Sequence, residues 1–161
     1  DERDKELIKN SEKEYFIGIV RIDTFNKNGI KIVEINADFP DGLFMHDITA
    51  RKIADLEGKK LISKPHSKIF SELLSSVIEK DKNIFIGYDK ERTFIDEFIL
   101  TKEELIKYGW KNISVESFDK IDLKNNSLYY KNKKIDLIRR GTELSKLREL
   151  KELIKTIEKS D

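Results

Sequence analysis

The sequence predicts an α/β fold in which an antiparallel β-hairpin precedes a small parallel sheet. Two runs rich in β-branched and aromatic residues, 15–24 and 30–36, flank Lys27-Asn28-Gly29, and Asn-Gly between two such runs is the strongest short hairpin signal. Residues 84–118 then read as strand, helix and strand, which is the pattern of a parallel βαβ unit. A chain of 161 residues has room for one compact domain or two small lobes.

The remaining elements follow from hydrophobic spacing and turn residues. Apolar residues at helical spacing predict helices over 43–56, 67–79 and 93–108, and Thr101-Lys102-Glu103-Glu104 resembles a capping box that would interrupt the third of these helices. Short β-rich runs predict strands over 84–88, 113–118, 121–123, 128–130 and 134–139, of which 121–123 and 128–130 flank Asn125-Asn126 as a small hairpin.

The domain boundary is expected in the polar stretch 58–66, which contains one of the two prolines. We therefore expect a first lobe over residues 1–62 and an α/β domain over residues 63–141. A stripe of leucine and isoleucine among charged residues predicts a C-terminal helix over residues 142–161.

Composition excludes several classes of protein. Lys and Arg number 32 against 31 Asp and Glu, a balance that argues against a nucleic-acid binder. The absence of cysteine excludes disulfide scaffolds and thiolate metal sites, and two histidines exclude a histidine-rich metal site. No apolar run reaches the roughly 18 residues that span a bilayer, and the first ten residues are too charged for a signal peptide. We therefore expect a cytoplasmic protein without membrane or nucleic-acid partners.

The predicted hairpin brings four polar side chains together. A type I′ turn centred on Asn28-Gly29 places Asp23 opposite Glu34, and the same register places Arg21 opposite Asn36. Alternate strand residues share a face, so all four side chains converge on one patch. Two carboxylates and an amide oxygen are hard ligands of the kind that Mg²⁺ selects, and an arginine beside them can bind phosphate.

An ordinary surface is the alternative to this metal site. Arg21 can form an ion pair with Asp23 or Glu34 on the solvated face that most hairpins have. Because Ile17, Ile19 and Ile32 continue the same face, the polar patch would interrupt an apolar surface. A loop longer than two residues would shift the pairing and can move side chains to the other face.

The same residues resemble a known family. Arg21-Ile22-Asp23, then Glu34-Ile35-Asn36 and its continuation Ala37-Asp38-Phe39-Pro40, resemble the R-x-D…E-x-N-A-D-x-P segment of glutathionylspermidine synthase-like proteins, which are circularly permuted ATP-grasp ligases. Residues 134–140, Lys-Ile-Asp-Leu-Ile-Arg-Arg, resemble the I-D-x-x-Y-R-R stretch that closes the pre-ATP-grasp domain of this family, with Ile138 in place of the common tyrosine. The resemblance covers roughly residues 15–141.

The resemblance implies a fold and a set of roles. It implies an antiparallel hairpin of an ATP-grasp core joined to a small Rossmann-like pre-ATP-grasp domain. Asp23, Glu34 and Asn36 would hold the Mg²⁺ ions that bridge the phosphates of ATP, and Arg21 would contact the transferred phosphate. The implied chemistry is attack of a carboxylate on the γ-phosphate, giving an acylphosphate that an amine opens to an amide.

What the resemblance does not cover limits the expected activity. The adenine pocket and phosphate-binding lysines of the permuted family lie beyond the pre-ATP-grasp domain, so the rest of an ATP-grasp chain is expected as a partner of these residues. We expect this chain to be a fragment of a carbon–nitrogen ligase acting on small carboxylates and amines, and to be inactive or nearly so by itself. The competing hypothesis is a non-enzymatic α/β interaction module.

Other polar residues carry weaker functional signals. Gly87-Tyr88-Asp89 ends a predicted strand, where open α/β sheets bind ligands, but such an end is most often only a turn. Arg139 and Arg140 either reach an anionic substrate or form surface ion pairs. His46 and His66 are expected to be surface or packing residues, with a general base as the less favoured role of His46.

Overall fold

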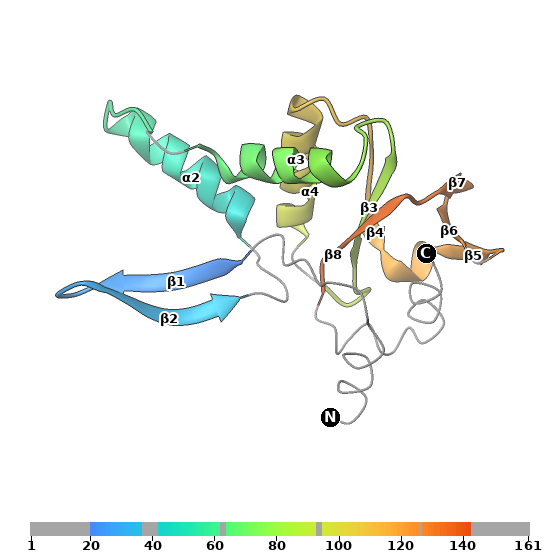
Figure 1. The fold of residues 1–161 in the computed structure, drawn as a ribbon, viewed down its shortest axis with the longest axis horizontal. Helices are drawn as coiled ribbons and strands as arrows, with labels where there is room; N and C mark the ends of the chain where they lie inside the picture. The colour runs from blue at the N-terminus through green and yellow to red at the C-terminus, as the bar shows by residue number, and fades with distance from the viewer. Residues whose placement is uncertain (1–19, 37–41, 62–63, 93–94, 126, 143–161) are drawn as a thin grey trace, which may run out of the picture. The chain divides into compact units, whose positions relative to one another are not determined.

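The computed structural model describes residues 20–36, 42–61, 64–92, 95–125 and 127–142 (Figure 1). The chain divides into two compact units, Asp1–Ala37 and Asp38–Asp161. The mixed α/β fold expected from the sequence is confirmed, because the first unit holds an antiparallel hairpin and the second holds helices and a parallel sheet.

The first unit contains the predicted hairpin. Strands β1 (Arg21–Asn26) and β2 (Ile30–Asn36) pair antiparallel, and Asn26 lies opposite Ile30 at the turn. Asn28 and Gly29 both have positive φ, 57° and 107°, as the Asn-Gly signal requires. The loop nevertheless spans 27–29, so the prediction that Lys27 faces its partner Ile30 across a two-residue turn is wrong.

The second unit is built around a parallel sheet with the strand order β4-β3-β8. The strand–helix–strand unit predicted for residues 84–118 is confirmed as β3, α4 and β4, and the small hairpin predicted around Asn125-Asn126 is confirmed as β5 and β6. The elements of this unit are α2 (Leu43–Leu56), α3 (His66–Val77), β3 (Asn83–Tyr88), α4 (Asp96–Lys107), β4 (Asn112–Ser117), the 3-10 turn η1 (Phe118–Lys120), β5 (Asp122–Lys124), β6 (Ser127–Tyr130), β7 (Lys133–Lys134) and β8 (Leu137–Arg140).

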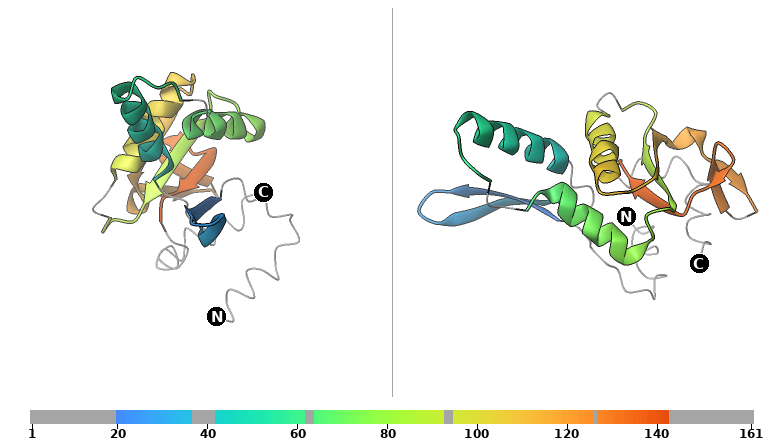
Figure 2. Two further views of the ribbon diagram at one scale, coloured as in Figure 1. Left: turned by 90° about the vertical axis from the view of Figure 1, so that its left-hand side faces the viewer. Right: turned by 90° about the horizontal axis from the view of Figure 1, so that it is seen from above.

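Both faces of the parallel sheet are covered. Phe85 in β3 packs with Phe118 and Ile135 on the side where β5–β7 lie, while Ile84 and Ile86 point to the opposite face because side chains alternate along a strand. Helices α2, α3 and α4 lie on that opposite side (Figure 2). The buried middle of the central strand, Ile84–Gly87, is accordingly without polar side chains, as is typical of parallel sheets.

Helices α2 and α3 begin where carboxylates from other helices bind their N-terminal amides. The carboxylate of Glu97 in α4 accepts hydrogen bonds from the backbone amides of Phe44 and Met45 at 3.0 and 3.1 Å, at the start of α2. The carboxylate of Asp47 in α2 accepts bonds from the amides of His66 and Ser67 at 3.0 and 2.9 Å, at the start of α3. These bonds satisfy donors that have no partner within their own helix.

Some expectations differ from the structure or lie outside it. Helix α4 runs without a break through Thr101, whose hydroxyl donates to the carbonyl oxygen of Glu97 at 2.7 Å, so the predicted interruption is wrong. Helix α2 packs on α3 and α4 within the second unit, and therefore lies with the residues expected to form the α/β domain. The lobe boundary predicted from the polar stretch 58–66 stays a prediction, and the helix predicted over 142–161 lies outside the described residues from 143 onward.

Among the described residues, none of the helices has the length and apolar character that crossing a bilayer requires.

Replacing Glu97 with glutamine tests the cap of α2. The amide keeps one acceptor oxygen but presents an NH₂ group to the second backbone donor, so we expect the free energy of unfolding to fall by about 1–3 kcal/mol. Urea unfolding followed by the fluorescence of Trp110, which is buried at 2% exposure, measures this change. Glu103→Gln, on the exposed side of the same helix, is the matched control and should stay within about 0.5 kcal/mol; equal effects of the two substitutions would contradict the cap.

Candidate functional site

The hairpin brings together the four side chains that the sequence singled out. Asp23 lies directly opposite Glu34, and Arg21 lies directly opposite Asn36. Residues opposite one another in an antiparallel pair share a face, as do residues two apart on one strand. The four side chains therefore occupy one face of the hairpin, and we call this group the hairpin patch.

The pairing predicted for the hairpin patch is correct, but the loop and the strands reach it in a way that the sequence did not predict. Next to the turn, Asn26 pairs with Ile30 and Thr24 with Ile32. Each partner is one residue earlier in β2 than the predicted two-residue turn would place it. A register shift between Asp23 and Thr24 leaves Val33 as an extra residue on β2, which is a β-bulge. The longer loop and the bulge cancel, so Asp23 meets Glu34 as expected.

The bulge also corrects the expected surroundings of the hairpin patch. Because Ile32 pairs with Thr24, it shares a face with Ile22 and Ile35, not with Glu34 as expected. Ile17 and Ile19, which were expected beside it, lie outside the described residues. The isoleucines of β1 and β2 thus gather on the face opposite the patch, and Ile22, Ile30, Ile32 and Ile35 are 51%, 77%, 60% and 60% exposed within the structure.

Polar contacts within each strand hold the hairpin patch. The guanidinium of Arg21 donates to both carboxylate oxygens of Asp23, from Nε at 2.9 Å and from a terminal nitrogen at 3.1 Å. The side-chain amide of Asn36 donates to Oε1 of Glu34 at 3.1 Å. Of the two ion pairs that the alternative hypothesis allowed for Arg21, the one with Asp23 is present, and it offsets the repulsion between the facing carboxylates.

The donor chemistry of the hairpin patch fits a hard cation. Asn36 uses its NH₂ group toward Glu34, which leaves its carbonyl oxygen as a further acceptor. Arg21 and Asp23 keep 33% and 41% of their side chains exposed, and an exposed ion pair is worth only about 0–1 kcal/mol. The guanidinium could therefore bind a phosphate beside the cation.

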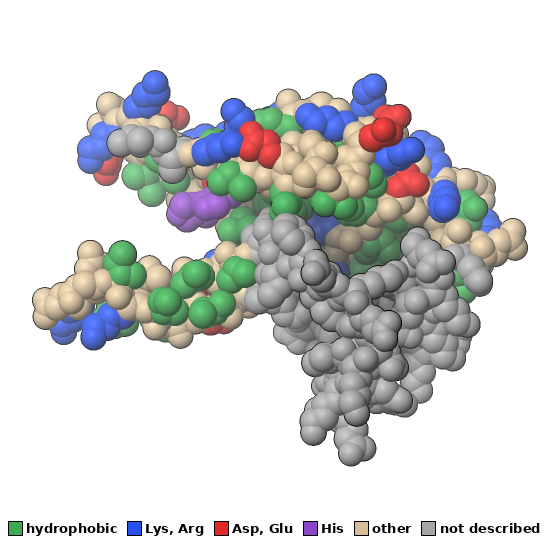
Figure 3. All heavy atoms as spheres, viewed as in Figure 1, with side chains coloured by type: hydrophobic (Ala, Val, Ile, Leu, Met, Phe, Trp, Pro, Cys, Tyr) green, Lys and Arg blue, Asp and Glu red, His purple; other side chains and the backbone are tan. Residues whose placement is uncertain are grey.

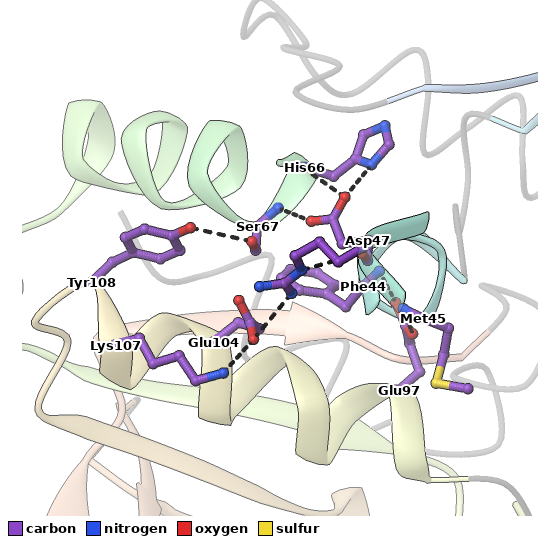
Figure 4. Close-up of polar contacts among 10 residues, drawn as sticks. Phe44, Met45, Asp47, His66, Ser67, Glu97, Glu104, Lys107 and Tyr108 are labelled. Carbon is purple, nitrogen blue, oxygen red and sulfur yellow. Dashed lines mark hydrogen bonds and ion pairs between the residues drawn. The ribbon is translucent and has the colours of Figure 1, made fainter. Parts of the chain in front are cut away.

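A second polar cluster, which sequence analysis did not identify, joins α2, α3 and α4 (Figure 4). Asp47 is 6% exposed, and besides the two backbone amides of α3 it contacts the Nδ1 atom of His66 at 2.8 Å. Glu104, 3% exposed, contacts Arg51 at 3.4 Å and Lys107 at 2.5 Å. Helical spacing predicts the pairing of Glu104 with Lys107 three residues later. The contacts of Asp47 with His66 and of Glu104 with Arg51 join different helices, so they depend on how the helices pack.

Both buried carboxylates are held in the charged form. Burial alone would raise the pKa of Asp47, but hydrogen bonds from the backbone amides of Ser67 and His66, and the contact with the His66 ring, outweigh burial and lower it below 3.8. Burial likewise opposes ionisation of Glu104, whose pKa is lowered by its hydrogen bond to Lys107 and by the charge of Arg51. The charge of each carboxylate is thus compensated locally.

The strand ends singled out from the sequence bind one another. At the carboxyl ends of β3 and β8, Thr142 donates from its hydroxyl to Asp89 at 3.0 Å, and Arg140 donates to the carbonyl oxygen of Thr142 at 2.6 Å. The guanidinium of Arg139 lies over the rings of Phe70 and Phe98 at 5.6 and 5.7 Å from their centroids. Arg139 is therefore packed against aromatic rings of α3 and α4.

A comparison with models of protein families finds no match for this chain, and a comparison with curated proteins finds none either.

Replacing Asp47 with asparagine tests its charge as the cap of α3. The pKa of Asp47 is lower in the folded chain than its ordinary value of 3.8, so the carboxylate stabilises the fold above that pH, and the contribution is lost as pH falls through the folded pKa. We expect Asp47→Asn to lower the free energy of unfolding by about 1–3 kcal/mol at pH 7, and the difference to shrink below pH 3.8.

Urea unfolding at a series of pH values measures this difference. Asp55→Asn, at an exposed position of the same helix, is the control and should show no such loss. A gap between wild type and Asp47→Asn that stays constant into strong acid would contradict the assigned role of the carboxylate.

Proposed function

We propose that this chain is part of an ATP-dependent carbon–nitrogen ligase of the ATP-grasp type, and that the hairpin patch supplies its ligands for Mg²⁺ and phosphate. The observation that carries this proposal is the pairing of Asp23 with Glu34 and of Arg21 with Asn36 on one face of the hairpin. The resemblance of the R-x-D and E-x-N-A-D-x-P segments to glutathionylspermidine synthase-like proteins names the family. The small parallel sheet of the second unit is compatible with a pre-ATP-grasp domain.

The donor set supports this assignment in detail. Asp23 and Glu34 offer carboxylate oxygens and Asn36 offers an amide oxygen, which are the ligands that Mg²⁺ takes while it keeps waters for substrate phosphates. Bound there, Mg²⁺ would neutralise charge on the phosphates of ATP. Arg21 would exchange Asp23 for the transferred phosphate, to which its guanidinium can bind through two nitrogens.

Within this proposal, the chain's residues position reactants and do no covalent chemistry. The carboxylate of one substrate attacks the γ-phosphate of ATP, the bond from that phosphorus to ADP breaks, and the acylphosphate reacts with an amine to give an amide and phosphate. Phosphoryl transfer of this kind depends on alignment and charge neutralisation.

A non-enzymatic interaction module is the second candidate, and two observations favour it. Arg21 and Asp23 already satisfy one another through two hydrogen bonds, and the opposite face of the hairpin exposes a row of isoleucines. On this hypothesis the polar face only keeps the hairpin hydrated, while the apolar face meets a partner.

Binding of Mn²⁺ distinguishes the two candidates. Mn²⁺ takes the same oxygen ligands as Mg²⁺, and its unpaired electrons broaden NMR signals close to it. We expect broadening of the backbone amide signals of 21–23 and 34–36, which Mg²⁺ reverses by competition. Saturating Mg²⁺ with ATP should also stabilise the fold by linkage, by about 2.7 kcal/mol at 100 times the dissociation constant.

Asp23→Asn with Glu34→Gln should abolish both effects. The two amides match the carboxylates in size, and both positions belong to the hairpin patch and not to a buried core. The double variant should therefore still fold. Asp122→Asn with Glu103→Gln removes the same charge from exposed positions elsewhere and should leave the response unchanged. Broadening that is absent from the hairpin, or that survives in the double variant, would remove the ligase proposal and favour the interaction module.

A further inference from the structure

The two histidines of the chain lie side by side at the junction of α2 and α3. His46 is in the first turn of α2 and His66 begins α3, and their ring centroids are 5.3 Å apart at an interplanar angle of 74°. Figure 3 shows the imidazoles as one patch at the molecular surface. Side chains twenty residues apart in the sequence, and the chain's only two of this type, are thus brought together by helix packing.

The carboxylate of Asp47 lies beside these rings and is buried. One potential ligand atom from each of His46, Asp47 and His66 lies within 4.8 Å of the other two. Asp47 is 6% exposed, whereas the side chain of His66 is 44% exposed. The cluster therefore has a buried, negatively charged base and an open side formed by imidazole.

Backbone hydrogen bonds fix the carboxylate in this cluster before any ligand arrives. The amides of His66 and Ser67 bind one oxygen each, Oδ1 and Oδ2 of Asp47, so the group cannot turn away from the histidines. An ionised carboxylate offers about four acceptor positions, and the amides occupy two of them. The third contact, from the Nδ1 atom of His66 to Oδ1 at 2.8 Å, is one that a cation could replace.

The ion pair between Asp47 and His66 explains only part of the arrangement. It accounts for the orientation of His66, but it gives no role to His46, whose ring meets His66 edge to face. Two imidazole nitrogens with one carboxylate oxygen are a ligand set that Zn²⁺ uses in proteins, with a remaining position open to water. Because the chain contains no cysteine, no thiolate competes for the ion.

We propose that His46, Asp47 and His66 form a binding site for a divalent transition-metal ion, with Zn²⁺ as the preferred occupant. Imidazole nitrogens bind Zn²⁺ and similar first-row transition-metal ions, whereas Mg²⁺ prefers oxygen ligands. This site is therefore chemically distinct from the hairpin patch. Tetrahedral ligands at zinc bond lengths lie roughly 3.4 Å apart. Because the candidate ligand atoms lie within 4.8 Å of one another, binding would require the exposed imidazoles to rotate toward the fixed carboxylate of Asp47.

Titration with Zn²⁺ and with Co²⁺ tests the site. The full 161-residue chain is used without a histidine tag, in a buffer free of chelators. We expect binding of one ion per chain by calorimetry, and for Co²⁺ the visible absorption bands of a site of low coordination number. His46→Asn and His66→Asn should each weaken binding by more than about tenfold. Even a substitution at a residue that only hydrogen-bonds to a metal ligand typically lowers metal affinity by about 10–100-fold.

Two controls separate this site from other metal-binding groups. Asp55→Asn, at an exposed position of α2, should leave the affinity for Zn²⁺ unchanged. Asp23→Asn with Glu34→Gln should leave it unchanged as well, because those residues belong to the hairpin patch. Failure of the magnesium experiment on the hairpin therefore has no bearing on this test, and the reverse also holds.

The imidazole ¹⁵N signals of the wild-type chain give a readout that does not depend on the variants folding. With only two histidines in the sequence, the spectrum contains two rings, and we expect both to shift together as Zn²⁺ is added. The proposal is overturned if no ion binds at sub-millimolar concentration, if only one ring responds, or if binding persists undiminished in both histidine variants.

Discussion

The arrangement of the second unit depends on buried carboxylates that bind the N-termini of neighbouring helices. The backbone amides at a helix start have no partners within the helix, and neither Gly42 nor Pro65, which precede α2 and α3, has a side chain that can accept their hydrogen bonds. Glu97 of α4 binds the start of α2, and Asp47 of α2 binds the start of α3. The helices therefore hold one another in sequence, α4 to α2 and α2 to α3.

This dependence links the packing of the helices to the chemistry at their junction. An uncompensated carboxylate would be costly at the burial of Asp47, so the two backbone amides and the His66 ring that bind it are needed to keep it charged. The same bonds fix its position. The carboxylate of Asp47 is thus held rigidly beside two imidazoles by the same bonds that cap α3. The proposed metal site adds His46 to the pair that Asp47 and His66 already form.

Local signals in the sequence predict the elements well and their contacts poorly. Asn28-Gly29 locates the hairpin, and the apolar run over 84–88 locates the central strand, because both depend on neighbouring residues alone. Thr101 carries a capping-box signal, yet its hydroxyl binds the carbonyl oxygen of Glu97 inside a continuous helix. The bond from Phe44 to Glu97 joins residues 53 positions apart, and no local pattern contains that information.

The hairpin patch shows how a correct pairing can rest on an incorrect local expectation. A three-residue loop by itself would set Asp23 against Val33, and since side chains alternate with a period of two, Glu34 and Asn36 would then face away from Asp23 and Arg21. The extra residue at Val33 shifts the register back by one, so that Glu34 pairs with Asp23. Valine carries no bulge signal, so the bulge is set by the pairing on either side of it. The bulge, more than the turn, is what keeps two carboxylates, an amide and a guanidinium on one face.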